Sequence, residues 1–107
     1  MEIKEYLKRT EILFKQIEDQ LEAFEEELDY DRTADKLEVM CLSDKAKLVM
    51  NTQRALSEVW LAGDAHGWHF KWQEESSQWW AQAEQMEFFQ CVNQWLNRHL
   101  NRPVHLK

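Results

Sequence analysis

The residues of this chain best suited to chemistry lie in one short stretch that contains eight carboxylates and no lysine or arginine. The stretch supplies the formal net charge of −7 of the 107-residue chain, because acidic and basic side chains nearly balance elsewhere. Carboxylate oxygens are hard donors, which suit iron, manganese, calcium or magnesium better than soft metals. The eight acids are Glu18, Asp19, Glu22, Glu25, Glu26, Glu27, Asp29 and Asp31. They predict a surface for cations or for a basic protein.

These acids fall on a segment with helical periodicity, which predicts a helix from about Ile3 to Leu28. Apolar residues recur three or four positions apart along it, at Leu13, Ile17, Leu21, Phe24 and Leu28. Like charges at the same spacing destabilise a helix by about 0.2–0.5 kcal/mol per pair, so keeping them has a cost. A face that only confers solubility would normally include lysine, as the first part of this segment does. We therefore favour a binding surface over a merely solvated face.

No closed metal site can be built from this pattern. A calcium loop beginning at Asp29 would need glycine and glutamate at its sixth and twelfth positions, where the chain has Ala34 and Met40. A di-iron site of the helical-bundle type needs Glu-x-x-His on an inward helix face, and the segment contains no histidine. We therefore predict shallow binding of several exposed cations with little selectivity.

Other candidate sites are weaker. His66 and His69 form His-x-x-His, half of a zinc pattern, but no further ligand follows nearby, so two surface histidines are favoured. Nucleophile–base pairs, glycine-rich phosphate loops and paired buried carboxylates are missing from the sequence, and we expect the protein not to be an enzyme. Cys41 and Cys91 lie far apart in apolar segments, which predicts two reduced, buried thiols.

The acidic charge disfavours nucleic acid and anionic lipid as partners, and no apolar run is long enough to span a membrane. The chain starts directly with the amphipathic segment, which resembles neither a secretory signal nor an organelle transit peptide. We therefore expect a cytoplasmic monomer. An acidic mimic of nucleic acid, which would block a basic protein, remains a weaker alternative.

After the first helix the hydrophobic period changes to that of strands, with short polar breaks between them. A glycine-containing loop is expected at residues 63–67, and a second helix from about Glu84 that Pro103 closes. The order predicts a single α+β domain, residues 1–107, in which two helices pack on one face of an antiparallel β-sheet. Strands are expected at residues 30–34, 37–42, 47–53, 58–62, 68–72 and 78–81.

The strand pattern also predicts which side chains the sheet presents to water. Leu48 and Met50 are expected to face the helices. Asn51, Gln53 and, from the next strand, Trp60 then lie on the open face. An exposed tryptophan among amides on an open sheet is typical of a protein-docking surface, and a single scattered surface aromatic is the alternative.

Three blocks of the sequence resemble the frataxin family, in its bacterial branch. The blocks are Asn51-Thr52-Gln53, Val59-Trp60-Leu61-Ala62 and Gly67-Trp68-His69-Phe70. Together with the acidic first helix and the aromatic-led last helix, they extend the likeness over nearly the whole chain. Three loops depart from the family pattern, with Ala34-Asp35-Lys36 in place of Asn-Gly-Gly, Ala55 in place of proline and His66 in place of glycine.

The resemblance implies a frataxin-like two-layer sandwich and an iron-binding protein of iron–sulfur cluster assembly. In the family, acids of the first helix and first strand bind ferrous or ferric iron weakly, and other divalent or trivalent cations substitute. The matching metal-binding residues are Glu18, Asp19, Glu22, Glu25, Glu26, Asp29 and Asp31.

The resemblance also implies docking on a cysteine desulfurase and the scaffold of the iron–sulfur machinery, whose activity the protein would regulate. The alternative is an iron chaperone or storage protein with ferroxidase activity that is independent of the desulfurase. Whether iron drives the monomer to oligomerise is left open. The implied partner-binding residues are Glu18, Asp19, Glu22, Asn51, Gln53 and Trp60.

Overall fold

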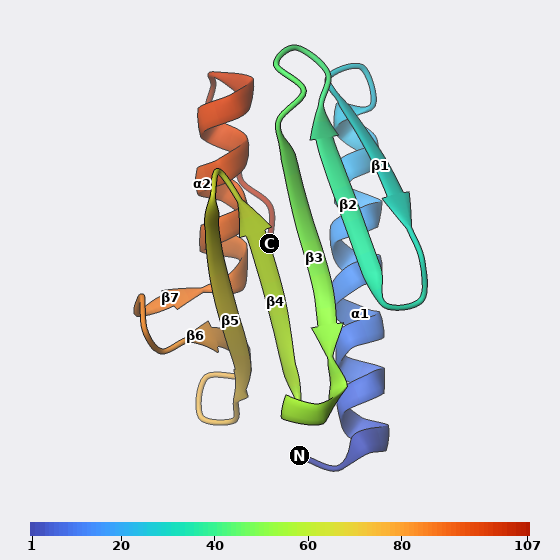
Figure 1. The fold of residues 1–107 in the computed structure, drawn as a ribbon, viewed down its shortest axis with the longest axis vertical. Coiled ribbons are helices and arrows are strands. Elements are labelled where there is room, and N and C mark those ends of the chain that lie inside the picture. The colour runs from blue at the N-terminus through green and yellow to red at the C-terminus, as the bar shows by residue number, and fades with distance from the viewer.

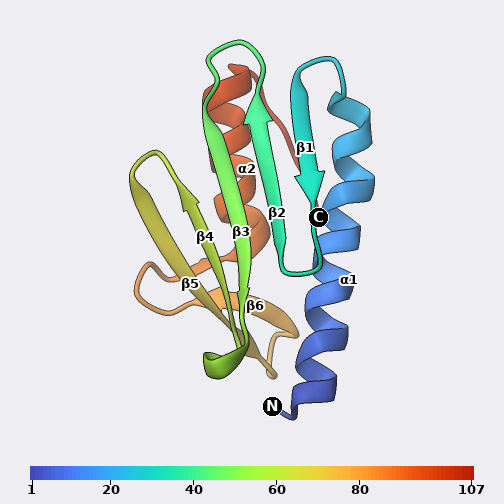
Figure 2. The ribbon, with the colours of Figure 1, turned by 45° about the vertical axis from the view of Figure 1, so that its right-hand side comes forward.

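The computed structural model describes all 107 residues and shows two helices on one face of a seven-stranded antiparallel sheet (Figures 1 and 2). Helix α1 spans Ile3–Leu21 and helix α2 spans Phe88–Leu100. Each strand pairs with the next one along the chain, which confirms the predicted α+β meander. The strands are β1 (Leu28–Arg32), β2 (Lys36–Cys41), β3 (Lys47–Gln53), β4 (Glu58–Gly63), β5 (His66–Gln73), β6 (Gln78–Ala81) and β7 (Met86–Glu87).

The core lies between the sheet and the helices, because one stripe of each helix and one side of each strand are apolar. Helix α1 contributes Tyr6, Phe14 and Ile17, each at most 1% exposed. Leu48 and Met50 of β3 are fully buried beneath the helices, as the alternation predicted. No helix covers the opposite face of the sheet (Figure 1). Neither helix is both long and apolar enough to cross a membrane.

Helix α1 ends at Leu21, so the prediction that it continues to Leu28 is wrong. The chain makes one 3₁₀ turn at Glu22–Phe24 and then enters β1, where Leu28 pairs with Cys41 of β2 and is 2% exposed. Carboxylates near a helix C-terminus oppose the macrodipole, and the last turn of α1 has no basic residue to offset them. The acidic run is therefore divided among the end of α1, the 3₁₀ turn, the residues that follow it and β1. Strands β1 and β2 accordingly begin slightly earlier than expected.

The glycine-containing loop expected at residues 63–67 is also wrong, because β4 and β5 include both glycines. The hairpin turn consists of Asp64 and Ala65, whose φ angles of 53° and 61° supply the left-handed backbone that two-residue hairpins require. Neither glycine has a positive φ. Gly63 is needed for close packing instead, because a Cβ there would lie 2.9 Å from the Leu48 Cδ1 atom.

Helix α2 begins at Phe88 rather than Glu84, because the short strand β7 comes first and pairs with β6. The Glu87 carboxylate caps the helix by accepting hydrogen bonds from the Phe89 N–H (2.9 Å) and the following N–H (3.2 Å). This side-chain cap fixes the start of the helix at the edge of the sheet.

Helix α2 ends at Leu100, because Asn101 adopts a left-handed conformation with φ of 55°. Pro103 therefore lies beyond the helix end rather than causing it. The chain then turns back and runs between the two helices to Lys107 (Figures 1 and 2).

Candidate functional site

The seven acids expected to bind metal form what we call the acidic ridge, along the C-terminal end of α1, the 3₁₀ turn and strand β1. Strand β1 is an edge strand and lies beside the end of α1 (Figure 2). All of the ridge residues except Glu18 are exposed, and Glu18 is half-buried. The ridge consists of Glu18, Asp19, Glu22, Glu25, Glu26, Asp29 and Asp31.

Tyr30 of β1 lies within the electrostatic field of the ridge. Partial burial raises the pKa of its phenol, and the negative charges of Glu22, Glu18, Glu25 and Asp19 raise it further. Four acids from the end of α1, the 3₁₀ turn and the residue after it therefore act on one side chain of the neighbouring strand. Although α1 ends at Leu21, these acids remain close to β1 in space.

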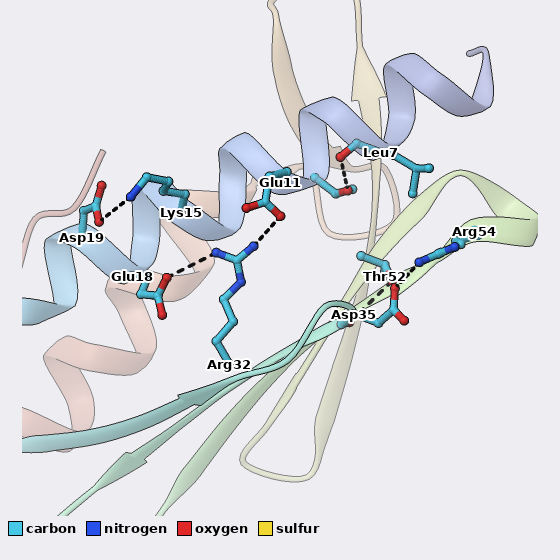
Figure 3. A network of polar contacts seen from close by, with 10 residues as sticks. Leu7, Glu11, Lys15, Glu18, Asp19, Arg32, Asp35, Thr52 and Arg54 are labelled. Atoms are coloured by element: carbon cyan, nitrogen blue, oxygen red, sulfur yellow. Dashed lines mark hydrogen bonds and ion pairs between the residues drawn. The ribbon is translucent and has the colours of Figure 1, made fainter.

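Arg32 is the internal counter-ion of the ridge (Figure 3). It extends from the last position of β1 to α1, where it contacts Glu11 Oε2 at 2.6 Å and Glu18 Oε1 at 3.3 Å. Its side chain is only 15% exposed and its guanidinium lies 5.7 Å from the centre of the Phe14 ring. Sequence reasoning missed this pairing, although the alternation of β1 places Arg32 on the same side as Leu28, facing the helices.

The other acids of the run differ in how they are neutralised. Lys15 approaches Asp19 at 3.3 Å in an exposed pair one helical turn apart, which adds little to stability (Figure 3). Glu27 pairs with Arg102 from the C-terminal segment and raises the pKa of that arginine. No Lys, Arg or His forms an ion pair with the remaining five ridge acids, which are Glu22, Glu25, Glu26, Asp29 and Asp31.

The ridge offers suitable donor atoms but no preformed metal site. No group of three or more histidine, cysteine, aspartate or glutamate side chains converges so as to hold one metal ion. A cation on the ridge would contact one or two carboxylates, with water completing its shell. The residues therefore fit weak, exposed binding of hard cations, iron among them, and do not fit a tight resident site.

The three residues predicted to dock a partner on the open sheet lie together, and we call them the sheet patch: Asn51, Gln53 and Trp60. Asn51 of β3 is directly opposite Trp60 of β4, which in turn is opposite His69 of β5. The Trp60 indole stacks on the His69 ring with centroids 4.3 Å apart, and its Nε1–H donates to Glu58 Oε1 at 2.7 Å. Trp60 is therefore half-buried and held in one orientation before any partner arrives.

The sheet register places part of the ridge on the same face as the sheet patch. Asp31 of β1 is opposite Glu38 of β2, which is opposite Val49 of β3, the residue two positions before Asn51. Side chains that alternate in this way share one face of a sheet. Asp31 of the ridge and the sheet patch therefore lie on the same face of the sheet.

The two other predicted features of the sequence are structural. His66 lies 3.5 Å from Glu84, whereas His69 stacks on Trp60, so the His-x-x-His pair does not converge on one point. Cys41 and Cys91 are free and buried, as predicted. Burial raises the pKa of the Cys91 thiol to about 12, and the charges of Glu84 and Glu87 add to this.

A polar cluster at the C-terminal end of α2 was not predicted from the sequence. The His99 ring, 14% exposed, contacts Asp44 through Nδ1 at 2.7 Å and Asp64 through Nε2 at 2.8 Å. Burial alone lowers the pKa of His99, but the hydrogen bonds to both carboxylates outweigh it and raise that pKa. The hydrogen bond from His99, with one from the Ala46 N–H, lowers the pKa of Asp44 to about 2. The cluster joins α2 to the β2–β3 loop and the β4–β5 turn.

Comparison with known proteins decides the family. The sequence model of the frataxin-like domain matches residues 1–102 of the chain. The chain belongs to the frataxin family. A frataxin structure from Psychromonas ingrahamii has the same fold, with a TM-score of 0.90 at 23% identity over 100% of this chain and 99% of that one.

Bacterial relatives carry the same likeness in sequence. The iron-sulfur cluster assembly protein CyaY of Paraburkholderia phytofirmans is 28% identical over 107 residues, which cover 100% of this chain and 99% of the relative. The protein of the same name from Histophilus somni (strain 2336) is 37% identical over 94 residues, or 88% of each chain. The predicted membership of the bacterial branch of the frataxin family is therefore confirmed.

Proposed function

We propose that this protein acts in iron–sulfur cluster assembly, where it binds iron weakly on the acidic ridge and regulates a cysteine desulfurase and its scaffold by docking on them. One observation supports the proposal most strongly. Five exposed carboxylates of the ridge have no ion-pair partner within the chain, although like charges crowd there. The names of the bacterial relatives supply the process.

Iron bound to the ridge would exchange readily. Single carboxylates of Glu22, Glu25 and Asp29 would hold a ferrous or ferric ion as cargo, and the open coordination positions leave it free to pass to an acceptor. Weak, exposed binding suits delivery or sensing better than storage. Sustained oxidation of ferrous iron by the chain alone would instead support the chaperone and storage alternative.

The role of the ridge toward a partner is electrostatic. A dense row of uncompensated acids attracts a basic surface over several ångströms, which raises the rate of encounter and makes the complex sensitive to salt. The sheet patch adds the less polar part of the interface, with the oriented Trp60 indole at its centre. Glu18 and Asp19 differ from the other five ridge acids, because Arg32 and Lys15 already contact them.

The proposal is tested by measuring binding to the desulfurase as a function of salt for two charge-reversed variants. In the first, Glu22, Glu25 and Glu26 are changed to Lys, since none of them is paired within the chain. The matched control changes Glu74 and Glu75, exposed residues in the β5–β6 turn, together with Glu2, so both variants gain the same net charge.

We expect the ridge variant to lose binding and the control to bind within about threefold of the parent chain, because only net charge is common to both. Equal losses in both variants would mean that the overall charge, and not the ridge, attracts the partner. Unchanged binding in both would contradict the proposed docking surface.

A further inference from the structure

The C-terminal tail, residues Val104 to Lys107, lies between the two helices in an extended arrangement. Val104 and Leu106 are 6% and 4% exposed, whereas His105 between them is exposed. This alternation of buried and exposed side chains is that of an extended peptide lying on an apolar floor. Figures 1 and 2 show the tail passing from the end of α2 back along that helix, and its last residue contacts Gln20 of α1.

Side-chain amides of the helices hold the backbone of this tail. The Asn93 amide accepts from the Leu106 N–H at 2.7 Å and donates to the Leu106 carbonyl at 3.0 Å. The Gln20 amide does the same for Lys107, with both distances at 2.8 Å. A side-chain amide that donates one hydrogen bond to the backbone and accepts another pairs with it as a neighbouring strand would. This pairing does not depend on the side chains of the bound segment. The groove therefore recognises extended backbone as such.

The groove continues past the tail as an open cavity of about 660 Å³ between α1, α2 and the adjoining ends of β5 and β6. Two further amides line it in the same two rows. Gln16 lies one turn before Gln20 on α1, and Gln90 lies one turn before Asn93 on α2. Neither the Gln16 nor the Gln90 side chain makes a hydrogen bond in the structure, and Trp79 lies at the cavity wall.

The far end of the cavity is lined by Trp72 and Arg9. The Nε1 atom of Trp72 is buried and has no hydrogen-bond partner, which is costly for a polar group. The Arg9 guanidinium lies 4.0 Å from the centre of the Trp72 ring and contacts Glu5 at 2.9 Å. Because Glu5 contacts only part of the Arg9 guanidinium, other N–H groups of that guanidinium can donate to a second acceptor.

We propose that this open half of the groove binds an extended segment of a partner protein, in line with the tail and beyond Lys107. The continuity of the groove with the bound tail argues for this occupant, because the two rows of amides carry on past Lys107 through Gln16 and Gln90. The segment has apolar side chains at alternate positions and an acidic residue that reaches Arg9. A cavity of this volume lies in the usual range for ligand sites.

The test uses the whole chain and a fluorescein-labelled peptide, acetyl-Val-Thr-Val-Thr-Leu-Asp, with a rearranged peptide in which the apolar residues are adjacent. Binding is followed by fluorescence anisotropy and by the indole N–H signal of Trp72 in NMR spectra. The variant replaces both Gln16 and Gln90, which are exposed, by Ala. The matched control is Gln82→Ala, an exposed glutamine outside the groove.

We expect saturable binding of the alternating peptide, a shifted Trp72 indole signal, and at least about tenfold weaker binding (about 1.4 kcal/mol) in the double variant only. Three results would overturn the proposal: no binding to the parent chain, equal binding of both peptides, or equal affinity of the double variant and the control. Displacement of the tail, seen as loss of the signals of Val104 to Lys107 from their bound positions, would also overturn it.

Discussion

Arg32 of β1 contacts Glu18 of α1 at 3.3 Å, so the residue directly after the acidic run neutralises one of its members (Figure 3). The same guanidinium contacts Glu11 at 2.6 Å, which ties the edge strand to two turns of the helix. The ridge is therefore not uniform. It has a neutralised end at Glu18 and a free stretch from Glu22 onward.

Replacing Arg32 by Gln should have two opposite effects. Stability should fall by about 1 kcal/mol, because two carboxylates lose a largely buried partner. The affinity of the ridge for a divalent cation should rise about threefold, because a nearby positive charge is removed. Urea unfolding and cobalt titration measure the two effects.

The control for Arg32 is Arg54→Gln, which breaks an exposed pair with Asp35 at 2.8 Å in a different part of the molecule. It should leave cation affinity unchanged. A rise in affinity in both variants would show that net charge, rather than position beside Glu18, sets the binding.

Glu25→Lys should stabilise the protein. The residue lies just after the 3₁₀ turn that follows α1, among like charges and without an ion-pair partner. Reversing its charge should raise the unfolding free energy by about 0.5 kcal/mol and the midpoint temperature by about 2–4 °C. Glu74→Lys, at an exposed turn, should change neither by a measurable amount. Destabilisation by Glu25→Lys would show that this carboxylate makes a favourable contact.

Gly63 and Gly67 should respond differently to alanine. A Cβ at Gly63 would lie 2.9 Å from Leu48 Cδ1 and 3.0 Å from Trp95 Nε1, both buried, whereas a Cβ at Gly67 meets nothing closer than 3.9 Å. Gly63→Ala should therefore cost about 1–3 kcal/mol through overpacking, and Gly67→Ala should be tolerated. Thermal unfolding of the pair measures the difference, and similar midpoints would contradict the packing explanation.

The His99 cluster should make stability depend on pH in a defined direction. The folded-state pKa of His99 is raised, so its contribution is complete below the unfolded pKa and is lost as pH rises through the folded pKa. Asp44 acts in the opposite sense, because its folded pKa of about 2 gives stability that is lost as pH falls through the acid range. Arg98 also pairs with Asp64.

The corresponding variant is His99→Gln, with His105→Gln as an exposed control. Urea unfolding should show a larger loss for His99→Gln at about pH 6 than at about pH 9, and no such difference for the control. A loss that is the same at both pH values would mean that His99 stabilises the protein through packing on Trp95 rather than through its charge.

The sequence predicted the layers and the faces well, because alternation in β3 and β4 is a local signal that burial of Leu48 and Met50 enforces. The end of α1 was missed, since Leu28 satisfies both a helical stripe and a strand pattern. The Asp64–Ala65 turn was missed because glycine is the usual residue at positive φ, and here two other residues adopt it.

Contacts between distant residues could not be predicted in the same way. His99 meets carboxylates 55 and 35 residues earlier in the chain, and no local pattern reports such a pairing. Arg32 was within reach of sequence reasoning, because the alternation of β1 places it on the helix side once the strand is known to begin at Leu28. The eight acids of the run were identified from composition, whereas the choice of seven of them as metal-binding residues came from the family resemblance.

The central claim is that the free carboxylates of the ridge serve both cation uptake and docking. The most direct measurement neutralises Glu22, Glu25, Glu26 and Asp29 to Gln or Asn and follows iron or cobalt titration by NMR together with binding to the desulfurase. We expect the parent chain to show shifts confined to residues 18–31. The neutralised chain, still folded, should lose both activities. Retention of both in the neutralised chain would contradict the account.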